Sequence, residues 1–299
     1  MKILALDAGG TTMKSAIIGD DNELLAMQVT PTNSTSPEVL METALQVAAG
    51  YDDYDVLSVS MTGQIDHQNR SVLFRYFTGQ AAATAGVPVG QRLEEAVKKP
   101  VFLLNDSNAA ALGEAHLGAG RGHKDFLCLT YGTGVGGAII QDGRLYTGQV
   151  GIAGEVGHMV THVGGRLCGC GHRGCYERYA STSALVKAAR RHDPTIENAK
   201  QLLEAAPDDP RLRRVLSSWE REIVEGLCTL TYIFNPGCLI LGGGIMEREN
   251  VFLAVQKKFQ KRVIPTFSDV RIVPAQLGNR AGMYGAAVYA RQQLETLRR

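Results

Sequence analysis

Short apolar runs that end in glycine-rich turns are the most regular feature of this chain. One run, residues 2–7, ends at an aspartate and is followed by Gly-Gly-Thr-Thr, and a second run, 126–130, is followed by a Gly-Thr-Gly turn. Two further short apolar segments joined by a polar turn follow each glycine turn, which is the pattern of a β-hairpin. This repeat of strand, glycine turn and hairpin indicates two similar halves.

Strands and helices alternate along the rest of the chain, which predicts a layered α/β fold. Ser107 is a good N-cap for the Ala-rich helix that starts there. Residues 62–90 are rich in Gly, Thr, Gln and Asn and allow no clear assignment. Further strands are expected at 56–61, 101–104, 238–241 and 269–273, and helices at 37–50, 91–99, 247–262 and 281–298, with a mostly helical stretch at 176–235.

Length and charge narrow the class of protein. The 299 residues suffice for about two domains. The 31 Lys and Arg balance the 30 Asp and Glu, which argues against nucleic acid or an anionic membrane as a partner. No apolar run approaches the roughly 18 residues of a membrane span, and the first one is too short for a signal peptide. We therefore expect a cytoplasmic protein.

Three glycine turns, each after an apolar strand, are candidate phosphate-binding sites, because backbone N–H groups at such turns can approach phosphate oxygens closely. Asp7, at the end of the first strand, could hold Mg²⁺, usually through water. No turn fits a Walker A or a dinucleotide-binding motif. The candidate residues are Asp7, Gly9, Gly10, Thr11 and Thr12; Gly132, Thr133 and Gly134; and Gly242, Gly243 and Gly244.

Asp106 is a candidate general base. It follows Asn105 where an apolar strand gives way to a helix, and ligands bind at such junctions in open α/β sheets. A carboxylate there can accept a proton from a substrate hydroxyl. Spacing alone equally allows Asp106 to be only a cap for the helix.

Clustered cysteines indicate a metal site. Cys168, Cys170 and Cys175 fall within eight residues of a glycine-rich stretch, and Zn²⁺ accepts Cys and His ligands. Spacing leaves the fourth ligand open among His158, His162 and His172, and a set of free thiols is the alternative. The remaining cysteines lie in apolar runs and are expected in the core.

Two glutamates, Glu155 and Glu177, lie near this cluster and could hydrogen-bond a polyol. Solvated surface, or for Glu177 a helix N-terminal charge, is the alternative.

Together these segments resemble the ROK family of sugar kinases and repressors. The resemblance rests on D-x-G-G-T at 7–11, N-D at 105–106, G-T-G-x-G-G at 132–137, G-E-x-G-H at 154–158, C-G-C-G-x-x-G-C-x-E at 168–177 and the glycine triplet at 242–244. It implies a duplicated ribonuclease H-like, actin-like fold of two α/β domains with an interdomain cleft. We expect a small domain at 1–107, joined by the C-terminal helix 285–299, and a large domain at 108–284 with the zinc loop.

The resemblance also implies an activity, namely transfer of the γ-phosphoryl group of ATP to a sugar hydroxyl, usually at C6, by a homodimer that uses Mg²⁺. Asp106 would be the general base, and the first two glycine turns would bind the phosphates of ATP, with Gly242–Gly244 near its adenosine. The family's sugar-binding positions fall here on Asn105, Glu155, His158 and Glu177. His158 would also complete a structural zinc site with Cys168, Cys170 and Cys175.

The substrate is less well defined by these residues. Arg75–Gln80 replaces the segment with Asn and Trp that glucokinase-like members carry, so an N-acylhexosamine, another hexose or a glycoside competes with glucose. Thr62 and Gln64 could line the sugar pocket, although 62–69 is expected to be a plain loop. A repressor is disfavoured because no winged helix precedes the first strand. A non-catalytic sugar-binding protein is disfavoured by Asp106 and the phosphate turns.

Overall fold

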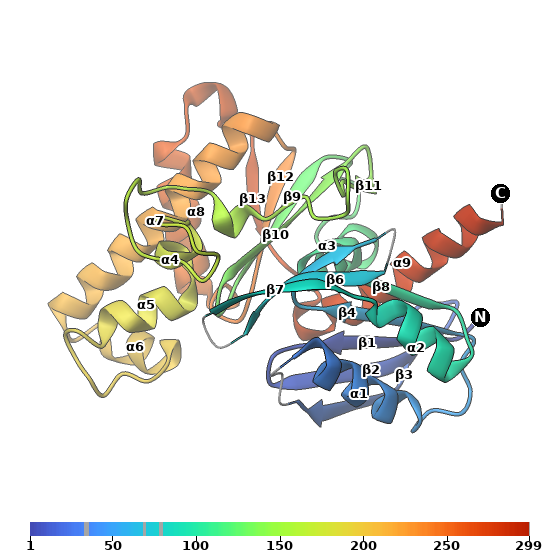
Figure 1. The fold of residues 1–299 in the computed structure, drawn as a ribbon. Helices are drawn as coiled ribbons and strands as arrows, with labels where there is room; N and C mark the ends of the chain where they lie inside the picture. Colours follow the sequence, from blue (N-terminus) through green and yellow to red (C-terminus); the bar gives the residue numbers. More distant parts are fainter. Residues whose placement is uncertain (33–35, 68–69, 78–79, 299) are drawn as a thin grey trace. The chain divides into compact units, whose positions relative to one another are not determined.

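The computed structural model describes residues 1–32, 36–67, 70–77 and 80–298, and shows an α/β protein of two compact units (Figure 1). The first unit comprises residues 1–122, 138–154 and 279–299. The second comprises residues 123–137 and 155–278. Among the helices in the described ranges, none has the length and apolar character to cross a membrane.

Two five-stranded sheets have the same strand order. The first runs β3-β2-β1-β4-β8 and the second β11-β10-β9-β12-β13. In the first sheet β1, β2 and β3 are antiparallel neighbours, whereas β1, β4 and β8 are parallel. In the second, β9, β12 and β13 are likewise parallel. The strands are β1 Ile3–Ala8, β2 Thr12–Ile18, β3 Leu24–Pro31, β4 Val56–Met61, β8 Val101–Asn105, β9 Phe126–Tyr131, β10 Val135–Gln141, β11 Arg144–Leu145, β12 Cys238–Gly242 and β13 Arg271–Pro274. The duplication expected from the repeated glycine turns is therefore confirmed.

A third, small sheet occupies the segment that the sequence pattern left unassigned. It consists of β5 Gln64–Asp66, β6 Ser71–Phe77 and β7 Gln80–Val87. The expectation of a plain loop at 62–69 was wrong, because β5 pairs with β6 and buries Ile65 completely. A strand with one apolar side chain in three residues is too short for alternation to reveal it.

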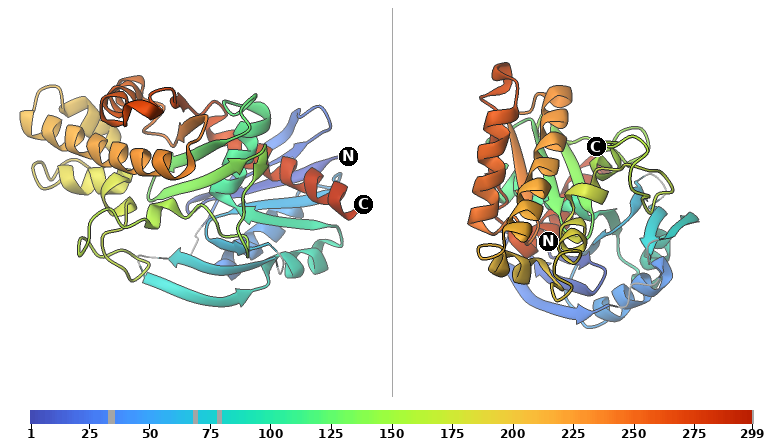
Figure 2. Two further views of the ribbon diagram at one scale, coloured as in Figure 1. Left: turned by 90° about the horizontal axis from the view of Figure 1, so that it is seen from above. Right: turned by 90° about the vertical axis from the view of Figure 1, so that its left-hand side faces the viewer.

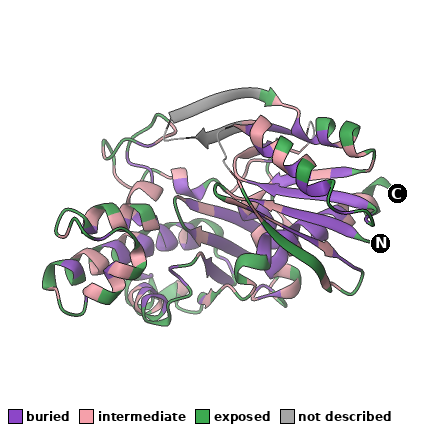
Figure 3. Ribbon diagram, turned by 90° about the horizontal axis from the view of Figure 1, so that it is seen from below, coloured by how far each residue is buried: buried purple, intermediate pink, exposed green. Residues whose placement is uncertain are grey.

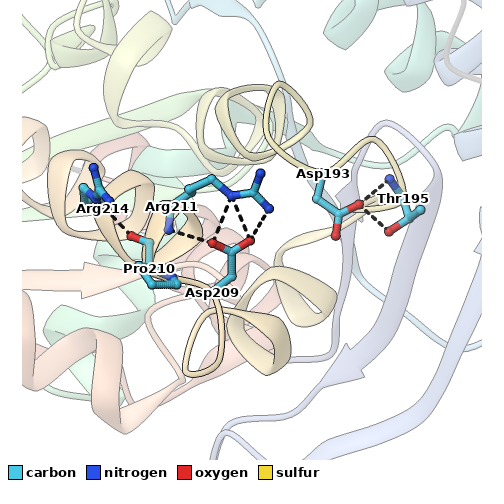
Figure 4. A network of polar contacts seen from close by, with 6 residues as sticks. All are labelled: Asp193, Thr195, Asp209, Pro210, Arg211 and Arg214. Atoms are coloured by element: carbon cyan, nitrogen blue, oxygen red, sulfur yellow. Dashed lines mark hydrogen bonds and ion pairs between the residues drawn. The ribbon is translucent and has the colours of Figure 1, made fainter.

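The helices follow the predicted pattern closely. They are α1 Pro37–Ala48, α2 Val89–Val97, α3 Asp106–Leu117, α4 Glu177–Ala180, α5 Thr182–Ala189, α6 Ala199–Ala205, α7 Pro210–Phe234, α8 Glu249–Arg262 and α9 Ala281–Leu297. In the second unit the long helices α7 and α8 lie side by side (Figure 2). Asp209 caps α7 by accepting the Arg211 amide at 2.7 Å, and the Arg211 guanidinium lies 2.8 Å from the same carboxylate (Figure 4). These hydrogen bonds lower the pKa of Asp209 to about 2.

The two faces of the first sheet are built from different residues. Alternate positions of β1 and β4, such as Leu6 and Val59, join a large apolar core with α1 and α2, and the central strands are buried (Figure 3). The opposite face carries small residues, including Ser58, whose hydroxyl donates to the Ala286 carbonyl at 2.7 Å. Small side chains let α9 approach the sheet closely, so a C-terminal helix packs against the N-terminal strands.

Glycines bring α9 equally close to α3. An added Cβ at Gly113 would lie 2.5 Å from the Ala281 carbonyl oxygen, and one at Gly285 would overlap the Ala109 carbonyl group. Neither contact could relax by a side-chain rotation, because backbone atoms are on the other side.

Replacement of Gly285 by alanine is therefore expected to destabilise the protein. The helix propensity of alanine would contribute about 1 kcal/mol, but overlap with a backbone carbonyl forces the helices apart and costs about 3 kcal/mol. We expect a net loss of about 2 kcal/mol, measured by denaturant or thermal unfolding. Gly244→Ala is the control, because an added Cβ there meets nothing within 4 Å. Equal unfolding midpoints for the two variants would contradict the prediction.

Candidate functional site

Two of the three predicted glycine turns border one pocket in the second unit. β9 and β12 are parallel neighbours with Thr130 opposite Gly242, so the turns that follow them lie at the same edge of the sheet. Gly243 has φ +97°, and a Cβ there would overlap the Tyr131 backbone, so only glycine fits. The pocket has a volume of about 770 Å³, and Gly132, Thr133 and Gly244 are among its lining residues.

The opposite wall of this pocket comes from α5, α6 and the loop between them. Val186 and Leu203 supply apolar surface, and Arg190 fixes the loop by donating to the carbonyls of Ile196 at 2.8 Å and Glu197 at 3.3 Å. The pocket is also strongly cationic, and its basic side chains are those of Lys187, Arg190, Lys200 and Arg248. Apolar surface, positive charge and exposed glycine turns together suit a nucleotide. Sequence reasoning missed this wall, since no motif marks α5 and α6.

The first glycine turn joins β1 to β2 in the first unit. Its backbone closes on itself through the Gly9 amide, which donates to the Thr12 carbonyl at 2.9 Å. Asp7 accepts the Ser60 hydroxyl at 3.1 Å and lies 3.5 Å from the Lys14 ammonium. Lys14 was missed in the sequence analysis, although a hairpin around this turn places it opposite Asp7. Gly10 and Thr11 are exposed, as a turn that binds a ligand requires.

Burial raises the pKa of Asp7, and the attraction of Lys14 offsets this only in part. A carboxyl whose pKa is higher in the folded protein binds its proton more tightly there, so ionising it destabilises the fold. Asp7→Asn is thus expected to be more stable than wild type at pH 7. The difference should shrink as the pH falls toward the ordinary pKa of an aspartate, about 3.9, and below it, where the unfolded chain is protonated too. Thermal unfolding from pH 3.5 to 8 measures this, and a pH-independent difference would contradict it.

Asp106 begins α3 directly after β8. The Asn105 carboxamide oxygen accepts the amides of Ser107 at 2.9 Å and Asn108 at 3.1 Å, so Asn105 is the N-cap. The expectation that Ser107 caps this helix was wrong, because the N-cap is Asn105, two residues earlier, and Asp106 is already helical. The Asn105 side chain also donates to the Gly63 carbonyl at 2.9 Å. Asp106 itself accepts the Ser107 amide at 2.7 Å, which orients its carboxylate.

Four potential metal ligands converge in the second unit. One ligand atom each of His158, Cys168, Cys170 and Cys175 lies within 4.8 Å of the other three. Cys170 Sγ is 3.5 Å from Cys175 Sγ, and Cys168 Sγ is 3.8 Å from His158 Nδ1. Tetrahedral zinc with these ligands separates them by about 3.5–3.8 Å. The donor set and its spacing therefore fit Zn²⁺.

The histidines left open by spacing have different surroundings. His162 stacks on the Tyr179 ring, with centroids 3.8 Å apart, and His172 is exposed and offers its carbonyl oxygen to the Cys168 amide. Burial lowers the pKa of His158 and raises those of Cys168 and Cys175. A neutral imidazole is a ready ligand, and buried thiols need a cation to become thiolates.

Both glutamates near the cluster contact its residues. Glu155 Oε2 lies 3.7 Å from His158 Nε2, so the imidazole has a carboxylate on the side away from the cysteines. Glu177 Oε1 accepts the Cys168 thiol at 3.0 Å. Glu177 also starts α4, so its alternative interpretation as a helix N-terminal charge describes its position correctly. The loop thus gathers the predicted sugar-binding carboxylates around the cluster.

The segment predicted to contact the sugar from residues 75–80 is only partly described. Thr78 and Gly79 lie outside the described residues, and the flanking positions belong to β6 and β7. Gln64 lies in β5, and Thr62 lies two residues before it, in the turn after β4.

The duplicated sheet and its glycine turns define the actin-like ATPase fold. The chain belongs to the ROK family, whose model matches residues 3–293. A glucokinase of Streptomyces coelicolor is 33% identical over 97% of this chain and 97% of its own. An N-acetylmannosamine kinase of Vibrio cholerae is 30% identical over 96% and 98%. The crystal structure of a Streptomyces griseus ROK glucokinase with glucose and AMPPNP covers 98% of this chain and 100% of its own, with 32% identity and a TM-score of 0.86.

Proposed function

We propose that this chain is an ATP-dependent sugar kinase that phosphorylates the 6-hydroxyl of a hexose or hexose derivative. The observation that carries the proposal is the pocket in which glycine turns from β9 and β12, about 110 residues apart, meet a cationic wall. Full-length similarity to glucokinases and to a structure with glucose and AMPPNP supports the same activity.

The proposed chemistry is a single displacement. The sugar oxygen attacks the γ-phosphorus, the bond from that phosphorus to the bridging oxygen breaks, and ADP leaves. Asp106 accepts the proton of the attacking hydroxyl, and the Ser107 amide keeps its carboxylate oriented. Phosphoryl transfer depends chiefly on positioning and charge neutralisation, which the glycine turns, Lys14 and the cations of the pocket supply.

Two metal ions belong to the proposal. Mg²⁺ would neutralise charge on the ATP phosphates, and Asp7 would hold it through water. Zn²⁺ at the Cys₃His cluster would be structural, since all four of its positions would be filled by protein ligands. Its part is to order the loop from which Glu155, His158 and Glu177 bind sugar hydroxyls. A homodimer and a cytoplasmic location stay predictions from the sequence, and light scattering on a sizing column tests the first.

N-acetylmannosamine or a related N-acylhexosamine is the second candidate substrate. It is favoured by the 30% identity with the Vibrio cholerae enzyme and by the missing Asn and Trp at 75–80.

The proposal is tested by ADP release from ATP and Mg²⁺ across a panel of sugars. The panel contains glucose, mannose, fructose, allose, N-acetylglucosamine, N-acetylmannosamine and cellobiose, and Asp106→Asn is the inactive control. We expect one sugar to exceed the others in kcat/KM and its kcat to fall about 10³-fold in the variant. A folded, zinc-loaded protein that phosphorylates none of them and binds no ATP would refute the proposal.

A further inference from the structure

Two buried tyrosines form a hydroxyl chain that the proposed chemistry does not use. Tyr131 and Tyr176 are both fully buried, and their hydroxyl oxygens are 3.0 Å apart. The Tyr176 hydroxyl also lies 2.9 Å from the Ile223 carbonyl, which can only accept. Tyr176 must therefore donate to Ile223, and Tyr131 must donate to Tyr176, because each hydroxyl has one proton.

Tyr176 is fixed at the centre of the segment that carries the predicted sugar-binding residues. It separates Cys175 from Glu177, and its amide donates to the Met159 carbonyl at 2.7 Å, directly after His158. Its ring packs on α7, where an added Cβ at Gly226 would overlap it. Neither the backbone nor the ring of Tyr176 is free to move while these contacts last.

Tyr131 is fixed to the phosphate turn in the same way. It directly precedes Gly132, and Thr182 holds both residues, with its amide on the Gly132 carbonyl at 3.0 Å and its hydroxyl on the Tyr131 carbonyl at 3.2 Å. On the other side of the turn, a Cβ at Gly134 would lie 2.6 Å from Glu177 Oε2. The phosphate turn and the segment around Tyr176 and Glu177 are thus in close contact, and an added Cβ at Gly134 would not fit between them.

We propose that Tyr131 and Tyr176 are positioning residues, whose hydroxyl link holds the phosphate turn in register with the segment that carries Glu177. This rests on the proposed kinase function. Phenylalanine at either position would fill almost the same volume and bury more apolar surface. The hydroxyls are therefore not needed for packing, and their role is to fix the two segments by a directional hydrogen bond. Nucleotide affinity therefore depends on the hydrogen bond between the Tyr131 and Tyr176 hydroxyls, although this bond contacts neither ATP nor the sugar.

The test is calorimetric binding of AMPPNP with Mg²⁺ to the zinc-loaded full chain. The variants are Tyr131→Phe, Tyr176→Phe and the double variant, and Tyr232→Phe is the control. Tyr232 lies in the same unit and accepts the Ile264 amide at 3.2 Å, outside the pocket and the metal cluster. We expect all three link variants to bind AMPPNP about three- to tenfold more weakly than wild type, the range for one lost hydrogen bond, and the control to match wild type.

Thermal unfolding of the same proteins separates positioning from stability. Tyr176→Phe leaves the Tyr131 hydroxyl buried without an acceptor and should be the least stable, whereas the double variant removes both hydroxyls and should recover most of the loss. Its AMPPNP affinity should not recover, because the link is still absent. Affinity that recovers with stability, or wild-type affinity in Tyr131→Phe, would overturn the inference. Wild type that binds no AMPPNP would overturn the proposed kinase function as well.

Discussion

Asp106→Asn is expected to lower kcat by about 10³-fold, the range for loss of a general base. Such a change corresponds to about 4 kcal/mol in the activation free energy. Asparagine has nearly the same shape and keeps an oxygen that can accept the Ser107 amide, as Asp106 does at 2.7 Å. It cannot take up the proton of the sugar hydroxyl. The N-cap of α3 comes from Asn105 and is untouched by the change.

The measurement is steady-state kinetics with the sugar that gives the highest kcat/KM. The KM for that sugar and the unfolding midpoint should stay close to those of wild type, because no packing atom is removed. Asp209→Asn is the matched control, because it makes the same Asp-to-Asn change at the start of a helix in the second unit. Asparagine is also a good N-cap for α7. A kcat within tenfold of wild type for Asp106→Asn would remove Asp106 as the base.

Loss of a metal ligand is expected to have the second large effect. Cys175→Ser replaces a buried thiolate ligand by a hydroxyl that binds zinc weakly, so bound zinc should fall from one ion per chain to almost none. The ion that would join His158 to Cys168 and Cys170 would then be lost from the loop around the cluster. We expect sugar affinity to fall at least about tenfold and the unfolding temperature to drop, because metal binding is coupled to local folding.

Zinc per chain is measured by atomic emission after dialysis, and sugar affinity by calorimetry. Cys228→Ala is the control, because Cys228 is equally buried but lies in α7, outside the group of four ligands. The control should keep one zinc ion and wild-type affinity. Zinc retained in full by Cys175→Ser would mean that the ion is held elsewhere. Zinc lost without any change in sugar affinity would show that the metal does not order the sugar-binding loop.

Sequence reasoning was most successful where a local pattern has one structural solution. An apolar run that ends in a glycine-rich turn favours a strand that stops at the edge of a sheet, and β1, β9 and β12 with their turns were predicted correctly. The nucleotide pocket could be predicted only in part. Its far wall depends on Arg190 holding Ile196 and Glu197, and no local pattern reports contacts of that kind.

The cysteine cluster shows the same limit. Three thiols in eight residues predict a metal site from spacing, but spacing could not choose among His158, His162 and His172. The choice of His158 came from the family resemblance, and in the structure His158 is the histidine grouped with the thiols. Tertiary contacts determine which histidine joins the cysteines. The His162 ring stacks on Tyr179, whereas the hydrogen bond from the Tyr176 amide to the Met159 carbonyl brings His158 to the cysteines.

The position of α9 has a consequence for how the chain is made. The first unit draws on residues 1–122, 138–154 and 279–299, so the small-residue face of its sheet lacks α9 until this helix has been synthesised. The second unit lies wholly between these segments and can fold while synthesis continues. The first strands to be synthesised are thus among the last to be completed, and a nascent chain halted before Asn279 would leave Ser58 without its α9 partner, the Ala286 carbonyl.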